Sequence, residues 1–200
     1  MRPVIGNLAR TSIATTGILG MRMLTQAATL ILVTRLLGPS LYGDYMAAAS
    51  LAVVAGLVPN LGSGYVLMAR AAREGSQAVE IWRYGWPLSI CIGTILCVVF
   101  PFLAQMLTQG TLSIGQLFLI GLAELLVTPL TQLLSFVLQA RDRVPQGQLL
   151  LWLPFFLRAI AAAVCLIFVE RSSIHFFIVL QVIGAMTGLI VALAVTLHVV

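Results

Sequence analysis

The stretch LLLWLPFFLRAIAAAVCLIF, residues 149–168, decides the fold class, because Arg158 is its only charged residue. A membrane-spanning helix needs about 20 largely apolar residues, and this stretch satisfies that requirement. Similar runs recur along the chain, without the polar/apolar alternation of membrane β-strands. The sequence therefore predicts an all-α, polytopic transmembrane bundle of six spans, at approximately 11–37, 41–69, 84–107, 113–139, 147–169 and 173–199.

The composition points to the same class of protein. Of the 200 residues, 60% are hydrophobic and 8% are charged, and the mean hydropathy is +1.08. A soluble domain carries about 25% charged residues, so this chain has too few charges to cover a water-facing surface. The net charge of +5 comes from arginines that are scattered along the chain rather than clustered into a stripe. A nucleic-acid partner is therefore not expected.

The arginines outside the span centres predict the orientation. One side of the membrane, reached through the N-terminal segment and alternate connectors, receives Arg2, Arg10, Arg70, Arg73, Arg83, Arg141 and Arg143. The other side receives Arg35 and Arg171. Since cytoplasmic connectors are enriched in positive charge, both termini are expected in the cytoplasm.

Three charged residues, Arg22, Glu124 and Arg158, fall near the middle of their predicted spans. An ionised group at a helix centre costs about 2.5–3.5 kcal/mol on insertion scales, and either interface is about 15 Å away. These side chains should therefore face a water-filled cavity or one another. If Glu124 neutralises one arginine in a buried pair that fixes helix register, the second arginine still leaves a surplus positive charge.

Two polar stripes accompany these charges. Span one carries, within an arc of about 60°, Thr11, Thr15, Arg22, Gln26 and Thr29. Span four carries a similar stripe of Ser113, Glu124, Thr128, Thr131 and Ser135, with Gln139 near its edge. Both stripes predict helix faces that line a polar space.

Glycine and proline predict irregular helices. The segment VPNLGSGYV, residues 58–66, predicts a break in span two, either as a packing irregularity or as a hinge for alternating access. Gly184 and Gly188 form a small-xxx-small pair that would let another helix approach closely.

The sequence offers no pattern that predicts an enzyme. It contains no P-loop, nucleophile elbow or paired carboxylates. Three cysteines lie in apolar runs and the two histidines, His175 and His198, lack metal-ligand spacing. We therefore expect no catalytic residues, no metal and no cofactor.

The stretches TRLLGPSLYGDYMAAASL, 34–51, and NLGSGYVLMAR, 60–70, resemble the start of the polysaccharide and O-antigen flippases. These belong to the multidrug/oligosaccharidyl-lipid/polysaccharide exporter superfamily. The resemblance implies a lobe of about six helices in a bacterial inner membrane, one half of a two-lobe fold around a central cavity. It also implies a lipid-linked oligosaccharide, carried on undecaprenyl diphosphate, as substrate, and a second lobe or glycan-assembly proteins as further partners.

On this resemblance, Arg22 and Arg158 are the candidates for binding the diphosphate, together with Gln26 on the stripe of Arg22. Glu124 is the candidate site for a coupling ion. Members of the family have twelve to fourteen spans, so the six-span chain resembles an N-terminal lobe alone. Two alternatives stay open: a cation-coupled multidrug antiporter, which would favour an acidic cavity, and a non-transporting scaffold or truncated fragment.

Overall fold

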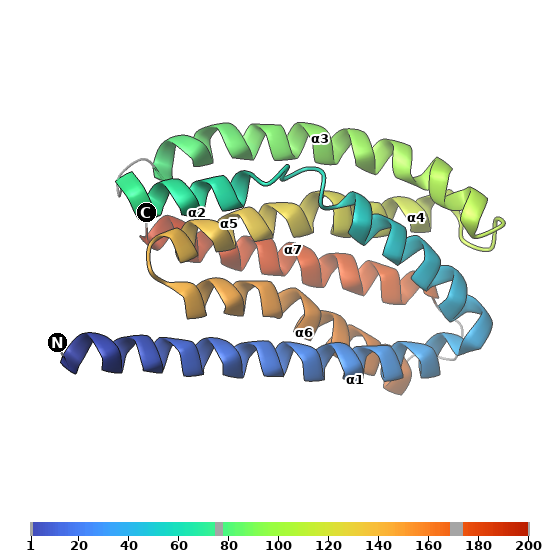
Figure 1. The fold of residues 1–200 in the computed structure, drawn as a ribbon. Helices are drawn as coiled ribbons and strands as arrows, with labels where there is room; N and C mark the ends of the chain where they lie inside the picture. The colour runs from blue at the N-terminus through green and yellow to red at the C-terminus, as the bar shows by residue number, and fades with distance from the viewer. Residues whose placement is uncertain (1, 75–77, 169–173, 200) are drawn as a thin grey trace.

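The structure is a computed structural model that describes residues 2–74, 78–168 and 174–199, with side chains described for 9–69, 85–168 and 174–198. Every regular element in these ranges is a helix. Five of the helices are long and apolar enough to cross a membrane. The prediction of an all-α helical bundle is thus confirmed, with the helix axes lying roughly parallel to one another (Figure 1).

The first helix, α1 (Arg2–Ala55), contains two arms that meet at a sharp bend. Gly38 at the bend has φ 74° and ψ 170°, a conformation that is open essentially to glycine alone, and Pro39 starts the second arm. No atom lies within 4 Å of where a Cβ of Gly38 would stand, so backbone conformation rather than space requires glycine there. The chain then turns back across the bundle (Figure 1).

The predicted break in span two is confirmed. The second arm of α1 ends at Ala55, and α2 (Ser63–Glu74) begins after an irregular turn. Leu61 and Gly62 in this turn have positive φ angles of 41° and 73°. The turn brings Asn60 into the interior, where the side chain is only 7% exposed.

The remaining helices are α3 (Ala78–Leu107), α4 (Ile114–Gly121), the π-helix η1 (Leu122–Val127), α5 (Thr128–Ala140), α6 (Val144–Phe168) and α7 (Ile174–Val199). The segments α4, η1 and α5 follow one another without interruption and make one crossing. Pro129, just after η1, has no N–H to donate one turn back, while the Thr128 N–H bonds the Ala123 carbonyl five residues earlier. Such a bond to the carbonyl five residues earlier is the hydrogen-bond pattern of a π-helix.

The crossing made by α4, η1 and α5 is the central one. In the most apolar part of this crossing 67% of the residues are buried, whereas in the most apolar part of α1 only 6% are buried. Glycines let its neighbours approach: a Cβ on Gly56 would stand 2.7 Å from the Glu124 carbonyl oxygen, and one on Gly93 would stand 2.7 Å from that of Leu125. Side chains larger than hydrogen at these two positions would therefore push the neighbouring helices away from η1.

The predicted close approach at Gly184 and Gly188 is also confirmed. Their Cβ positions would lie 3.0 Å from Leu157 and 3.0 Å from Pro154, both on α6. The small-residue face of α7 therefore packs directly on α6, as expected for helices in a membrane.

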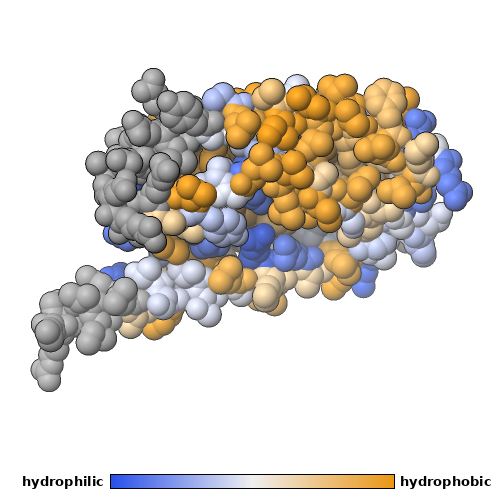
Figure 2. All heavy atoms as spheres, turned by 45° about the horizontal axis from the view of Figure 1, so that its top comes forward, coloured by the Kyte–Doolittle hydropathy of each residue, from blue (hydrophilic) through white to orange (hydrophobic). Residues whose placement is uncertain are grey.

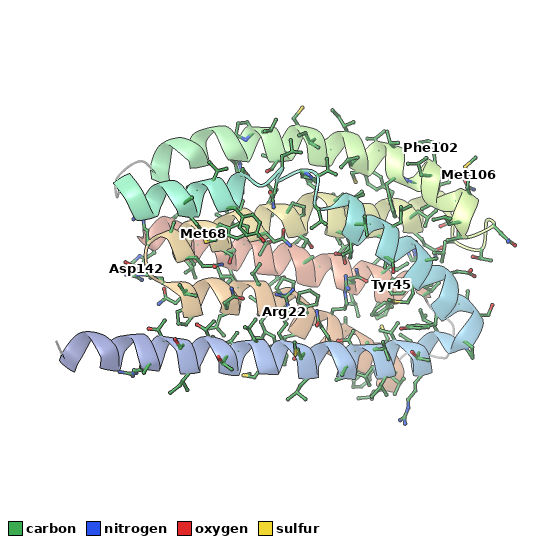
Figure 3. The ribbon with its side chains drawn as sticks, in the orientation of Figure 1. Arg22, Tyr45, Met68, Phe102, Met106 and Asp142 are labelled. Atoms are coloured by element: carbon green, nitrogen blue, oxygen red, sulfur yellow. The ribbon has the colours of Figure 1, made fainter. Side chains whose placement is uncertain are left out.

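The outside of the bundle is apolar, as Figure 2 shows for one face. Phe102 and Met106 on α3, for example, point outward (Figure 3) and are 62% and 82% exposed. The start of α1, the ends of α2 and α7 and the turn between α5 and α6 lie at the same end of the bundle (Figure 1). A membrane-embedded helical protein accounts for this surface, because lipid is the environment that such side chains prefer.

Candidate functional site

A cavity of about 630 Å³ opens among α1, the turn after α1, α2, η1, α5, α6 and α7. The three mid-span charged residues, Arg22, Glu124 and Arg158, all line this cavity. Figure 2 shows hydrophilic side chains in a hollow beside a large apolar area of the surface. The tertiary structure therefore brings together charges that lie on three different helices.

Glu124 and Arg158 form an ion pair. Their side chains are 8% and 21% exposed, so the carboxylate is the more deeply buried partner. The Gln181 side-chain amide donates to the same Glu124 oxygen at 3.4 Å, and the Tyr45 hydroxyl donates to Gln181 Oε1 at 2.7 Å. Glu124 is thus compensated by Arg158 within a network that links η1, α6, α7 and the second arm of α1.

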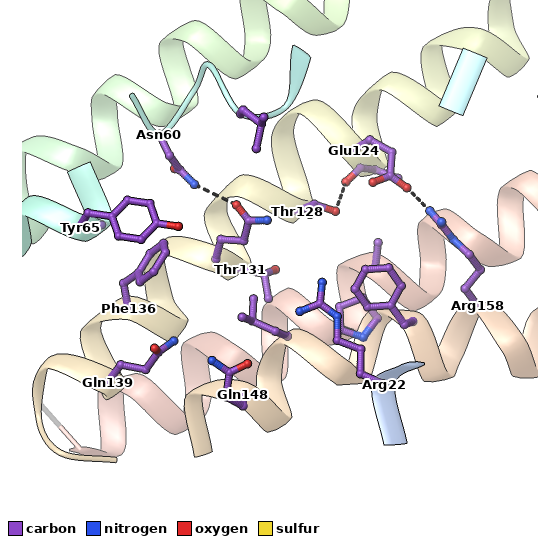
Figure 4. Close-up of a pocket in the computed structure, with 18 of the residues that line it drawn as sticks. Arg22, Asn60, Tyr65, Glu124, Thr128, Thr131, Phe136, Gln139, Gln148 and Arg158 are labelled. Carbon is purple, nitrogen blue, oxygen red and sulfur yellow. Dashed lines mark hydrogen bonds and ion pairs between the residues drawn. The ribbon is translucent and has the colours of Figure 1, made fainter. Parts of the chain in front are cut away.

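Arg22, on the first arm of α1, has a different environment. Its guanidinium carbon lies 4.7 Å from the centre of the Phe155 ring on α6. Among the side chains that the structure describes, no carboxylate lies within ion-pair distance of Arg22. Two of the described lining residues are cationic and one is anionic, and one pair is formed, so Arg22 supplies a net positive charge (Figure 4).

Gln26 does not line the cavity, in contrast to the expectation from the polar stripe of span one; its side chain is exposed. It lies about 40° around the helix from Arg22. The face of α1 that packs on α6 instead includes Thr25, whose hydroxyl accepts a 3.0 Å hydrogen bond from Trp152 Nε1. The face of α1 that packs on α6 is thus rotated from the predicted stripe towards Thr25, and it leaves Gln26 outside.

The residues of the polar stripe of span four have different roles in the structure. Glu124, Thr128, Thr131 and Gln139 line the cavity. Ser135 is buried and donates a 2.9 Å hydrogen bond to the Gly147 carbonyl on α6. Ser113 lies far from these residues and caps α4 through its side-chain oxygen.

The lining also includes carboxamide and aromatic residues that the sequence did not indicate as site residues: Asn60, Tyr65, Gln132, Phe136, Gln148 and Gln181. The Asn60 amide donates to the Pro129 carbonyl at 3.2 Å and to Gln132 Oε1 at 3.3 Å, while Ser89 donates to Asn60 Oδ1 at 3.0 Å. A carboxamide in an apolar span is itself a signal, because an unpaired polar group is costly in lipid. That signal would have identified Asn60, Gln132 and Gln181.

The site has the composition of a binding cavity. No group of three or more His, Cys, Asp or Glu residues that could hold a metal occurs within the described ranges. Cys91, Cys97 and Cys165 are free thiols, and none of them lines the cavity. Charge, carboxamides and aromatic rings in one concave space suit a ligand that has both an anionic and a neutral polar part.

No protein-family model, curated protein or solved structure matches this chain.

Proposed function

We propose that this chain acts as one lobe of a flippase that moves an undecaprenyl-diphosphate-linked oligosaccharide across the bacterial inner membrane, for lipopolysaccharide or exopolysaccharide synthesis. The observation that carries the proposal is the Arg22 guanidinium, which faces a cavity among apolar helices without a carboxylate partner in the described structure. A cation at this depth is costly unless something compensates it. A passing anionic group would provide that compensation.

The geometry of Arg22 suits a phosphate group. Phe155 lies against one side of the guanidinium, and the guanidinium N–H groups make no hydrogen bond with the part of the protein that the structure describes, so they are free to donate. Those donors match phosphate oxygens, which accept them in pairs. A diphosphate would thus bind at Arg22 without displacing the aromatic contact.

The Glu124–Arg158 pair argues against the alternative of a multidrug antiporter for cations. Among the described residues that line the cavity, Glu124 is the only acidic one, and it is already bound to Arg158. A cationic drug would have to displace an arginine to reach it. The cavity therefore favours anionic ligands, with Arg158 and Glu124 as a structural pair beside the ligand and Glu124 as the candidate for ion coupling.

Binding to the purified chain in lipid nanodiscs tests the proposal. We expect a polyprenyl diphosphate to bind and the corresponding uncharged polyprenol to bind more weakly. The variant Arg22→Gln should weaken diphosphate binding at least about tenfold, the loss expected for charge-assisted hydrogen bonds. The matched control is Arg35→Gln, since Arg35 is an exposed arginine of the same helix outside the cavity lining.

Glycan export in cells that lack their own flippase extends the test to transport. Export should fall with Arg22→Gln and persist with Arg35→Gln at equal expression. Diphosphate binding and glycan export that both survive the loss of Arg22 would contradict the proposal.

A further inference from the structure

Neutral polar residues gather at one end of the cavity. Figure 4 shows Tyr65, Phe136, Gln139 and Gln148 on the side remote from the Glu124–Arg158 pair, with Arg22 between the two groups. The charges are thus confined to one part of the cavity. We call the other part the neutral end; it is lined by Tyr65, Gln132, Phe136, Gln139 and Gln148.

The carboxamides of the neutral end keep hydrogen-bonding capacity for a ligand. Gln148 makes no hydrogen bond with the part of the protein that the structure describes. Gln132 uses its oxygen to accept from Asn60, which leaves its NH₂ group, and Gln139 donates to Ser135 at 2.8 Å, which leaves its oxygen. Donors and acceptors therefore lie close together in this part of the cavity. Hydroxyl groups, which both donate and accept, complement such a set.

The neutral end also has an aromatic wall. The rings of Tyr65 and Phe136 lie 5.3 Å apart at 53°, and Tyr65 is 67% exposed. A Cβ on Gly64 would overlap the Phe136 ring, so glycine at this position is what allows that ring to lie against α2. Aromatic faces offer apolar contact area beside polar groups. A pyranose ring matches this combination, because its C–H faces are apolar and its edge carries hydroxyls.

We infer that the neutral end binds the sugar next to the diphosphate, as an uncharged pyranose, while Arg22 holds the diphosphate. This inference rests on the proposed function and adds a specificity site to it. The cavity volume of about 630 Å³ is that of a small-molecule pocket rather than of a long glycan. Only the part of the substrate nearest the lipid would therefore enter, and the sugars further along the glycan would not be recognised here.

Two ligands separate the sugar site from the diphosphate site. The first is a polyprenyl diphosphate, and the second is the same lipid carrying one neutral hexose. Gln148→Leu and Tyr65→Leu should each weaken binding of the hexose-carrying lipid about three- to tenfold, the effect of losing one hydrogen bond or one ring contact. Binding of the sugar-free lipid should stay unchanged. The control is Gln105→Leu, since Gln105 lies on α3 outside the cavity lining.

The outcomes distinguish the two proposals. Equal binding of the hexose-carrying lipid by wild type, Gln148→Leu and Tyr65→Leu would overturn the sugar site, even if Arg22→Gln still abolished diphosphate binding. Unchanged binding of both lipids by Arg22→Gln would instead overturn the proposed function. A lipid carrying an acidic sugar serves as the last comparison: tighter binding than that of the neutral hexose would contradict an uncharged sugar site.

Discussion

Replacing Arg158 with methionine removes the partner of the most buried charge in the protein's cavity. The carboxylate of Glu124, 8% exposed, would be left with only the Gln181 amide at 3.4 Å. Removing one member of a buried ion pair typically costs about 3–5 kcal/mol, because the other charge remains without compensation. We expect Arg158→Met to lose stability in this range.

The opposite substitution should cost less. Glu124→Gln keeps an oxygen that can accept from Arg158, and the Arg158 side chain, 21% exposed, borders the cavity and can be hydrated there. A loss of about 1–3 kcal/mol is expected. The double variant carries no buried charge at either position, so its stability should return to within about 1 kcal/mol of wild type, since replacing a whole pair is often neutral.

Reversible denaturation of the four proteins in mixed micelles, followed by helical circular dichroism, measures these differences. The double-mutant cycle isolates the pair: a coupling energy of about 2 kcal/mol or more supports the argument. If Arg158→Met were as stable as the double variant, Glu124 would not need its partner, and the pair could not be what neutralises this part of the cavity.

Three further substitutions test individual features of the fold by the same denaturation assay. Gly38→Ala should lower the free energy of unfolding by about 1–3 kcal/mol, because the φ of 74° with ψ 170° at this position suits only glycine. The control Gly43→Ala, also in open space, should be neutral or slightly stabilising. Equal stability of the two variants would refute the backbone argument. Gly93→Ala should lose about 1–3 kcal/mol, because its Cβ would stand 2.7 Å from a carbonyl of η1, and an unchanged midpoint would show that α3 can shift freely. Tyr45→Phe should lose about 0.5–1.5 kcal/mol, because the hydroxyl bonds Gln181; no loss would exclude a stabilising role for that bond.

Much of the site could be predicted from the sequence, because charge in an apolar span is a local observation. The depth of Arg22, Glu124 and Arg158 in their spans placed them in one polar space, and the structure puts all three on one cavity. Gln26 lies outside the cavity lining, because helical periodicity predicts which residues share a face of one helix but not which part of that face meets the neighbouring helix. The uncharged residues Asn60 and Gln148 were missed because an amide in a span carries a weaker signal than a charge.

The sequence by itself determined that the chain forms apolar helices, that one span ends near residue 37 and the next begins near residue 41, and that the chain breaks before α2. Hydropathy, glycine and proline act on nearby residues, so these features are local. Only the tertiary structure decided that Glu124 pairs with Arg158, and that Arg22 lies against the Phe155 ring with no acidic partner in the described part of the chain. Both arginines lie at similar depth in their spans, so depth alone cannot choose between them. Which arginine pairs with Glu124 depends on which helix faces meet. Because Arg158 forms the pair, the free positive charge of the cavity is that of Arg22 on α1.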